Sequence, residues 1–219
     1  MYTKHQWNTD THFPFRYIQY LPKDFDETKT YPLVLFLHGA GEWGENLEDV
    51  ARHGFLQHIR ESGREYPFII VAPQCPAHKY WGCFTESLLA FLEEMCTTLP
   101  VDRDRVYLTG LSMGGTGTWM LAMAAPERFA AIAPICGTGI YWFGEALVDI
   151  PVMVFHGDCD EIVPVSESVS MVKSVNKRGG NATIHVCHGL EHNAWDPAYE
   201  GDYLEKWFLQ YRKKKTLQF

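Results

Sequence analysis

The chain has no excess of basic residues and no long apolar run. Its 219 residues carry 19 Lys and Arg against 27 Asp and Glu, a formal net charge of −8. Nucleic acids and anionic membranes favour a basic surface, so neither is expected as a partner. No segment reaches the roughly 20 apolar residues that a membrane span needs, and the first residues form no apolar signal region.

The sequence also lacks a disulfide framework. Its six cysteines are spread without a C-x-x-C pair. In a chain of this size that spacing is typical of buried thiols in a cytoplasmic protein, so a cytoplasmic location is predicted. Export with removal of a leader is the alternative. Cys136 and Cys159 are expected at the ends of neighbouring strands, so whether these two pair stays open at this point.

Repeats, low-complexity stretches and linkers are absent too, and the length suits one domain over residues 1–219. Strand and helix patterns alternate, which predicts an α/β fold: a mostly parallel central sheet with helices on both faces. Residues 136–150 are too few for a sizeable cap domain. The expected strands are 16–21 (at an edge), 33–37, 68–72, 106–109, 130–135, 152–155 and 183–187, and the expected helices are 85–99, 114–124, 166–177 and 203–211.

What the sequence does contain is a G-x-S-x-G motif, Gly110-Leu-Ser-Met-Gly114, between a strand pattern and a helix pattern. In that context the motif indicates a nucleophile on a sharp strand-to-helix turn. Glycines suit the flanking positions because the turn brings the chain close to its neighbours. The motif predicts Ser112 as a nucleophile.

A serine hydroxyl needs a base, and the base needs a third group to orient it. In α/β-hydrolases an acid and then a histidine follow the serine along the chain. The segment after a buried strand, His156-Gly-Asp-Cys-Asp-Glu-Ile-Val-Pro164, offers two acids. Its H-G-x-x-D-x-x-V-P form favours Asp160 as the orienting acid and Asp158 as a turn residue.

The base is predicted to be His192, in a loop after the last strand. His185 and His188 lie within or at the end of that strand. The spacing of the three histidines is compatible with a metal site, but a strand residue and a loop residue rarely converge, and no carboxylate or cysteine pair completes a tetrahedral set. We therefore expect no metal and no cofactor.

During attack by a serine, negative charge develops on the carbonyl oxygen of the substrate. Backbone N–H groups are needed to donate hydrogen bonds to that oxygen. The strand 33–37 ends in a small-residue loop, His38-Gly-Ala-Gly-Glu-Trp43. We expect the amides of Met113 and Ala40 to form the oxyanion hole, each donor being worth about 3 kcal/mol in the transition state. Gly41 is the alternative to Ala40, and His38 is expected to be structural.

These blocks, together with Ala72-Pro-Gln-Cys-Pro76 and His192-Asn-Ala-Trp-Asp-Pro-Ala-Tyr199, resemble the dienelactone-hydrolase-like and phospholipase/carboxylesterase-like α/β-hydrolases. The nearest subgroup consists of the predicted peptidases of the prolyl-oligopeptidase clan, several of which behave as esterases. The resemblance implies an α/β-hydrolase fold and acyl-bond hydrolysis by Ser112, Asp160 and His192. Dienelactone hydrolases use a cysteine nucleophile, so that activity is not expected. Trp43 stands where the subgroup often has an arginine, which removes a cation from the mouth of the site.

Together the motifs predict a serine hydrolase that cleaves small or aromatic carboxylic esters through an acyl-enzyme. A peptidase or an acyltransferase with the same triad is the alternative, and an inactive binding protein is a further one. The expected partner is a small-molecule ester, and a homodimer is left open. Residues in loops that should surround the serine are candidate substrate contacts: Gly41, Glu42, Trp43, Gln74, Trp81, Tyr141, Trp142 and Trp195.

Overall fold

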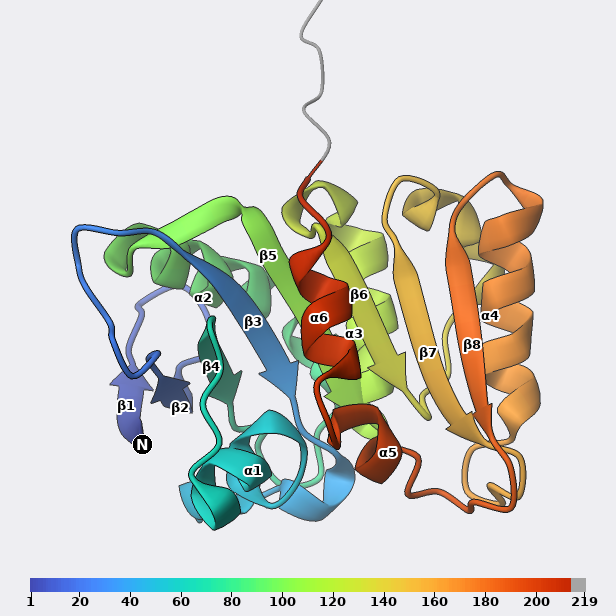
Figure 1. Ribbon diagram of the computed structural model, residues 1–219, viewed down its shortest axis with the longest axis horizontal. Coiled ribbons are helices and arrows are strands. Elements are labelled where there is room, and N and C mark those ends of the chain that lie inside the picture. The colour runs from blue at the N-terminus through green and yellow to red at the C-terminus, as the bar shows by residue number, and fades with distance from the viewer. Residues whose placement is uncertain (214–219) are drawn as a thin grey trace, which may run out of the picture.

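The computed structural model describes residues 1–213. Over these residues the chain forms one eight-stranded sheet in the order β1-β2-β4-β3-β5-β6-β7-β8, which Figure 1 shows face-on. The outer β1 and β2 are antiparallel to each other, β2 is antiparallel to β4, and the remaining pairs are parallel. The strands are β1 (Tyr2–Trp7), β2 (Phe15–Tyr20), β3 (Tyr31–Leu37), β4 (Ile69–Pro73), β5 (Val101–Leu111), β6 (Ala131–Ile135), β7 (Val152–Gly157) and β8 (Ala182–Cys187).

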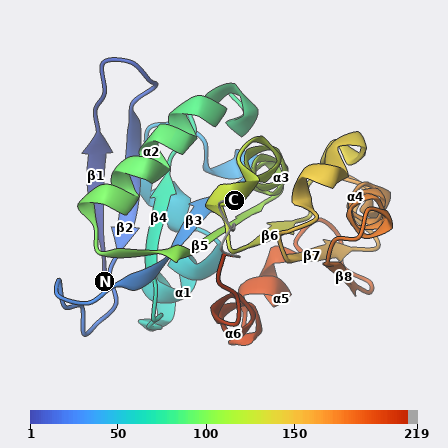
Figure 2. The same ribbon diagram turned by 90° about the horizontal axis from the view of Figure 1, so that it is seen from above.

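Helices cover both faces of this sheet, as the view from above makes clear (Figure 2). On one side lie α2 (Thr85–Thr98), α3 (Met113–Ala124) and α4 (Val165–Lys177). On the other lie α1 (Gly54–Ser62), α5 (Trp195–Tyr199) and α6 (Tyr203–Leu209). The predicted α/β-hydrolase fold, with a mostly parallel sheet and no sizeable cap domain, is confirmed. Between β6 and β7 the chain forms only the short 3-10 helix η5 (Tyr141–Leu147).

Two apolar cores hold the layers together, and the strand pattern explains why. Successive side chains of a strand point to opposite faces. Along β3, Leu33, Leu35 and Leu37 enter the core beneath α2 and α3, while Val34 and Phe36 enter the core beneath α1 and α5. All five are fully buried. A continuous apolar run is therefore required of this central strand.

Four elements differ from the sequence expectation: β1, β2, α1 and α5. The strand expected at 16–21 is not at the edge, because β1 pairs with β2 on its outer side. Most of β1 is exposed, so it carries little of the apolar alternation that would reveal it. The short helices α1 and α5 were also not predicted. The residues of α5 include Pro197, and α1 is only nine residues long, so neither gives a long periodic signal.

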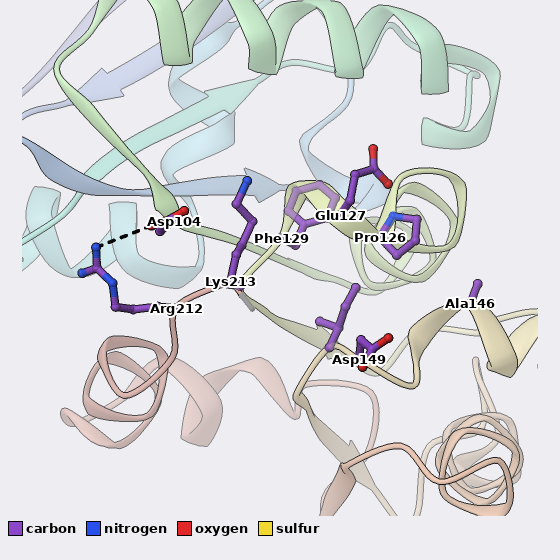
Figure 3. Close-up of a pocket in the computed structure, with 10 residues that line it drawn as sticks. Asp104, Pro126, Glu127, Phe129, Ala146, Asp149, Arg212 and Lys213 are labelled. Carbon is purple, nitrogen blue, oxygen red and sulfur yellow. Dashed lines mark ion pairs between the residues drawn. The ribbon is translucent and has the colours of Figure 1, made fainter. Parts of the chain in front are cut away.

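A cavity of about 730 Å³ lies at the amino-terminal edge of the sheet, where β6 and β7 begin (Figure 3). Its wall mixes charged and apolar side chains, and Arg212 lies 3.9 Å from the Asp104 carboxylate at one end. Ser112 does not line it. Parallel α/β sheets bind ligands at the opposite edge, where the strands end. The candidate residues of this protein gather at that opposite edge.

Candidate active site

Ser112 lies on the turn that joins the central strand β5 to α3. Its backbone has φ 55° and ψ −116°, which L-residues rarely adopt. Gly114 makes this turn possible, because a Cβ atom there would lie 1.9 Å from the carbonyl oxygen of Leu37. The turn thus packs directly against the end of β3. Its strained geometry is typical of a nucleophile elbow.

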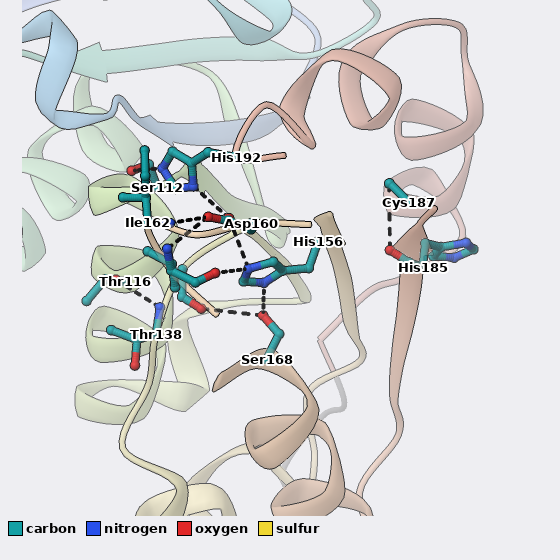
Figure 4. Close-up of polar contacts among 12 residues, drawn as sticks. Ser112, Thr116, Thr138, His156, Asp160, Ile162, Ser168, His185, Cys187 and His192 are labelled. Atoms are coloured by element: carbon teal, nitrogen blue, oxygen red, sulfur yellow. Dashed lines mark hydrogen bonds and ion pairs between the residues drawn. The ribbon is translucent and has the colours of Figure 1, made fainter. Parts of the chain in front are cut away.

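The structure brings Ser112, His192 and Asp160 into one hydrogen-bonded chain at the carboxyl edge of the sheet (Figure 4). The Ser112 Oγ lies 2.7 Å from His192 Nε2, and His192 Nδ1 lies 2.7 Å from Asp160 Oδ2. Because a carboxylate only accepts, Nδ1 carries the proton and donates it. Nε2 is then free to accept the hydrogen bond of the serine hydroxyl.

Asp160 follows β7 and is buried, and its two oxygens accept three hydrogen bonds. Oδ1 accepts the amides of Ile162 at 2.9 Å and Val163 at 2.8 Å, while Oδ2 accepts from His192. Burial raises the pKa of Asp160, but the hydrogen bonds from His192 and Val163 outweigh it and leave the pKa below its ordinary value. The carboxylate is therefore ionised at neutral pH.

The competing acid, Asp158, has other partners. Its Oδ2 lies 2.8 Å from His188 Nδ1, and its Oδ1 accepts the Gly189 amide at 2.7 Å. These contacts pin the end of β8 to the loop after β7 and leave Asp158 exposed. Of the two acids, the structure places only Asp160 against His192.

The loops that carry the acid and the histidine touch at Gly157. A Cβ atom at this position would lie 2.1 Å from the carbonyl oxygen of Glu191 and 2.3 Å from that of Leu190. The glycine of the His156-Gly157 pair is thus required so that the histidine loop can cross the end of β7. This crossing sets His192 above Asp160.

The loop after β3 lies beside the serine. The His38 Nε2 accepts the Cys75 amide at 2.9 Å, so its Nδ1 carries the proton and donates to the Gly39 carbonyl at 2.6 Å. Burial lowers the pKa of His38 to about 4, which keeps the ring neutral. Gly39 itself lies against Leu111, the residue before Ser112. His38 therefore fixes the loop that carries Ala40.

The two expected oxyanion donors each begin a helix. Met113 is the first residue of α3, and Ala40 is the first residue of the 3-10 helix η1 (Ala40–Glu42). First-turn amides have no acceptor within their own helix and can point at a ligand. Met113 directly follows Ser112 in the chain, and the loop that carries Ala40 packs through Gly39 against Leu111, the residue before Ser112.

An open cleft of about 500 Å³ reaches Ser112, and its lining is almost wholly apolar. Thr116 and Met120 follow Ser112 at intervals of four residues, so they lie on one face of α3. This helical spacing from Ser112 is a signal in the sequence that could have identified Thr116 and Met120 as cleft residues. The cleft is lined by Tyr80, Trp81, Gly82, Cys83, Ser112, Met113, Thr116, Gly117, Met120, Thr138 and Val163.

Among the expected substrate contacts, the structure places Trp81 in the lining of this cleft. Its ring is nonetheless 1% exposed, and its Nε1 donates to the His38 carbonyl at 2.9 Å. Trp43 lies at the rim, where its Nε1 is 3.2 Å from the Met113 sulfur and its ring meets Tyr80 edge-on. Trp81 therefore forms part of the cleft wall. Trp43 does not line the cleft and instead contacts two residues that do, Met113 and Tyr80.

Gln74, Glu42 and Gly41 do not line the cleft. Gln74 is buried and donates to the carbonyls of Glu42 and Asn46 at 3.3 and 2.9 Å. Glu42 is buried too, and burial raises the pKa of its carboxyl. Gly41 is exposed, with its carbonyl 3.5 Å from an Arg52 nitrogen. Gln74 and Glu42 thus stabilise the loop after β3 rather than line the cleft.

Tyr141, Trp142 and Trp195 also lie outside the cleft lining. Tyr141 and Trp142 are exposed in η5 and contact each other, with ring centroids 4.5 Å apart. Trp195 packs edge-on against the His192 ring at 5.4 Å. It therefore contacts His192 itself, and its ring also lies 5.3 Å from that of His53.

The three histidines whose spacing is compatible with a metal site do not come together in the structure. His185 stacks on Phe155 and His188 pairs with Asp158, so neither joins His192. Within residues 1–213, the one group of three potential ligands is Cys136, Asp160 and His192, whose ligand atoms lie within 4.8 Å of one another. Two of these already form the His192–Asp160 hydrogen bond.

All six cysteines of the chain are free thiols, so Cys136 and Cys159 form no disulfide. Cys136 is buried beneath the site, while Cys159 is exposed. Burial raises the pKa of the Cys136 thiol far above its ordinary value, which keeps it protonated. None of the helices in residues 1–213 is long and apolar enough to cross a membrane.

Comparison with known proteins decides the family. The family described as "Putative esterase" matches residues 13–210. The chain belongs to this esterase family. A structure described as that of a thermostable esterase superposes on this esterase-family chain with a TM-score of 0.86 and 32% identity. The match covers 97% of this chain and 63% of the other.

Two curated relatives contain the same unit. "Endo-1,4-beta-xylanase Y" of Acetivibrio thermocellus is 29% identical over 147 residues, covering 59% of this chain and 13% of the relative. "Probable feruloyl esterase C" of Aspergillus terreus is 27% identical over 176 residues, covering 78% of this chain and 64% of the relative. The chain thus spans less than two thirds of either protein. The resemblance to α/β-hydrolases is confirmed at the level of family and fold.

Proposed function

We propose that this protein is a serine esterase that cleaves carboxylic esters carrying an apolar or aromatic group, through an acyl-enzyme on Ser112. The observation that carries the proposal is the Ser112–His192–Asp160 chain of two 2.7 Å contacts at an apolar cleft. A serine that only occupied a tight turn would need neither the histidine partner nor the buried carboxylate behind that histidine. Relatives named as feruloyl esterases support the aromatic preference.

In the first half of the reaction, Ser112 Oγ attacks the ester carbonyl carbon. His192 Nε2 takes the hydroxyl proton, while Asp160 holds the Nδ1 proton and stabilises the imidazolium that forms. The amides of Met113 and Ala40 donate to the oxyanion of the tetrahedral intermediate. When this collapses, the bond to the alcohol oxygen breaks and His192 gives its proton to the leaving alcohol.

In the second half, a water molecule attacks the acyl-enzyme carbonyl. His192 Nε2 now accepts the proton of that water, and the Ser112 oxygen leaves and takes the proton back. The carboxylic acid is released and the site returns to its starting state. No step requires a cofactor or a metal ion.

The cleft sets the substrate class. Its wall carries the Met120 and Met113 side chains, Tyr80 and the edge of Trp81, and no charged side chain. An anionic group would lose its hydration there without gaining a partner. A volume of about 500 Å³ accommodates an aromatic acid or a medium alkyl chain, so we expect both to be accepted.

The test is a rate panel of p-nitrophenyl esters from acetate to decanoate, with methyl ferulate and a peptidyl anilide beside them. Wild type and Ser112→Ala are compared, and Ser112→Ala is expected to lose about a millionfold in kcat. Ester turnover that disappears in Ser112→Ala supports the proposal. Anilide turnover without ester preference would instead indicate a peptidase.

Two further outcomes would overturn the assignment. Transfer of the acyl group to an added alcohol in preference to water would identify an acyltransferase. If no substrate were turned over and a fluorophosphonate failed to label Ser112, the protein would instead be a binding protein. Retained activity in Ser112→Ala would refute the nucleophile itself.

A further inference from the structure

The second histidine of this site is His156, at the end of β7, and it has no part in the reaction above. Its side chain is completely buried. A buried imidazole costs stability unless both nitrogens are satisfied, and an apolar side chain would fill the space more cheaply. Here both nitrogens have partners on the two segments that build the acid loop. The contacts of this residue are drawn in Figure 4.

On one side of the ring, His156 Nε2 faces only acceptors. It lies 2.7 Å from the Val163 carbonyl oxygen and 3.2 Å from Asp160 Oδ2. Nε2 therefore carries a proton and donates it to the Val163 carbonyl, with the carboxylate close beside. The Asp160 oxygen concerned is the one that accepts from His192.

The backbone of Val163 is thus held on both sides of its Cα. Its amide donates to Asp160 Oδ1 at 2.8 Å, and its carbonyl accepts from His156. This closes the loop between Asp160 and Val163 around the carboxylate. Val163 also contributes to the wall of the cleft, so the same bond sets one edge of the substrate space.

On the other side of the ring, His156 Nδ1 lies 2.7 Å from Ser168 Oγ in the first turns of α4. The Ser168 hydroxyl lies 3.4 Å from the Gly137 carbonyl. Gly137 packs against the backbone of Gly115 and Thr116, immediately after the nucleophile turn. His156 therefore connects the acid loop through α4 to the helix that carries Ser112.

We propose that His156 is a positioning residue of the esterase, which holds the Asp160–Val163 loop so that Oδ2 stays aligned with His192 Nδ1. The inference rests on the proposed function of the Ser112–His192–Asp160 chain. His156 touches neither the substrate nor the serine, and it acts through Asp160. A displacement of about 1 Å in such a group is enough to reduce the rate about a hundredfold.

The two nitrogens can be tested separately with a matched pair of variants. The amide nitrogen of glutamine reaches the place of Nε2, while that of asparagine reaches the place of Nδ1. His156→Gln therefore keeps the donor to Val163, and His156→Asn keeps only the contact with Ser168. We expect His156→Gln to stay within several-fold of wild-type kcat on p-nitrophenyl acetate, and His156→Asn to fall by about a hundredfold.

A double-mutant cycle separates positioning from a general effect on folding. His156→Asn and Asp160→Asn are measured singly and together, with the rate of Ser112 labelling by a fluorophosphonate as the readout. If His156 acts through Asp160, the second substitution adds little to the first. Equal losses of rate in both backgrounds, or full activity of His156→Asn, would overturn the proposal.

Labelling rates are corrected for the fraction of folded protein, measured by circular dichroism. Should neither His156 variant fold, Ser168→Ala carries the same cycle, because it leaves the imidazole in place and removes its hydrogen bond at Nδ1, together with the longer contact to the Gly137 carbonyl. It is expected to slow labelling several-fold in the wild-type background and not at all beside Asp160→Asn. A failure of the proposed function is recognised differently: wild type would then fail to label Ser112 at all.

Discussion

The strained turn at Ser112 leads to a prediction about stability that is independent of any substrate. Its φ of 55° and ψ of −116° lie outside the regions that side chains with a Cβ favour. Such a backbone costs of the order of 1–3 kcal/mol, and glycine avoids the cost. Replacing Ser112 by Gly or by Ala removes the same hydroxyl and the same hydrogen bond to His192. The two variants differ in the Cβ alone.

We therefore expect Ser112→Gly to be more stable than Ser112→Ala. Glycine gives back about 0.5–1 kcal/mol through its larger entropy in the unfolded chain. The net advantage is about 1 kcal/mol, which corresponds to roughly 2–4 °C in Tm for a domain of this size. Both variants should be inactive. The serine that catalysis needs at this position is therefore less favourable for stability than glycine.

Urea unfolding followed by tryptophan fluorescence measures the difference. Thr116 supplies the control, because it lies four residues after Ser112, in α3, and has a helical backbone. There Thr116→Gly should be less stable than Thr116→Ala by about 1 kcal/mol. If Ser112→Ala proved as stable as Ser112→Gly while the Thr116 pair behaved normally, the strain at the turn would be refuted.

Other predictions follow from the charged groups. Asp160→Asn should lower kcat by about 10⁴-fold and Asp158→Asn by only a few-fold, and the reverse order in a rate assay would assign the acid to Asp158. Burial holds the pKa of Glu42 above its ordinary value, so its ionised form destabilises the fold: Glu42→Gln should raise Tm at neutral pH, with the gain vanishing at acid pH. The pKa of His38 falls from the ordinary 6.5 to about 4, so the unfolded chain binds the proton first. Folding stability should drop by about 3 kcal/mol as the pH falls from 6.5 to 4, and His38→Gln should lack that loss in pH-dependent urea titrations.

Several features could be predicted from the sequence because they depend on neighbours along the chain. Leu33–Leu37 had to be a strand buried on both faces, since the run is apolar without alternation. The glycines around Ser112 marked a sharp turn, and the order of Ser112, Asp160 and His192 followed the chain order of the fold. The structure places these three side chains in hydrogen-bond contact. Their roles in catalysis stay a prediction.

Other features depended on contacts between distant segments. Glu42 and Gln74 look like polar loop residues in the sequence, and only the packing of the loop after β3 against β4 buries them. Tyr141 and Trp142 follow β6 as expected, yet the chain carries them to η5 beside α4, away from the cleft. In the sequence, His156 looks like a residue at the end of an apolar strand, and only the structure shows its contacts with Val163 and Ser168.

The sequence by itself determined the strands from β2 to β8, the helices α2, α3, α4 and α6, their order and the turn that exposes Ser112, because periodicity and turn chemistry act over a few residues. Only the tertiary structure decided which side chains meet. The cleft draws on the segment after β4, on α3 and on the loops after β6 and β7, and its wall is set by how these pack. The contact of His156 with Ser168 likewise exists only once α4 has docked on the sheet, because no local pattern links these two residues.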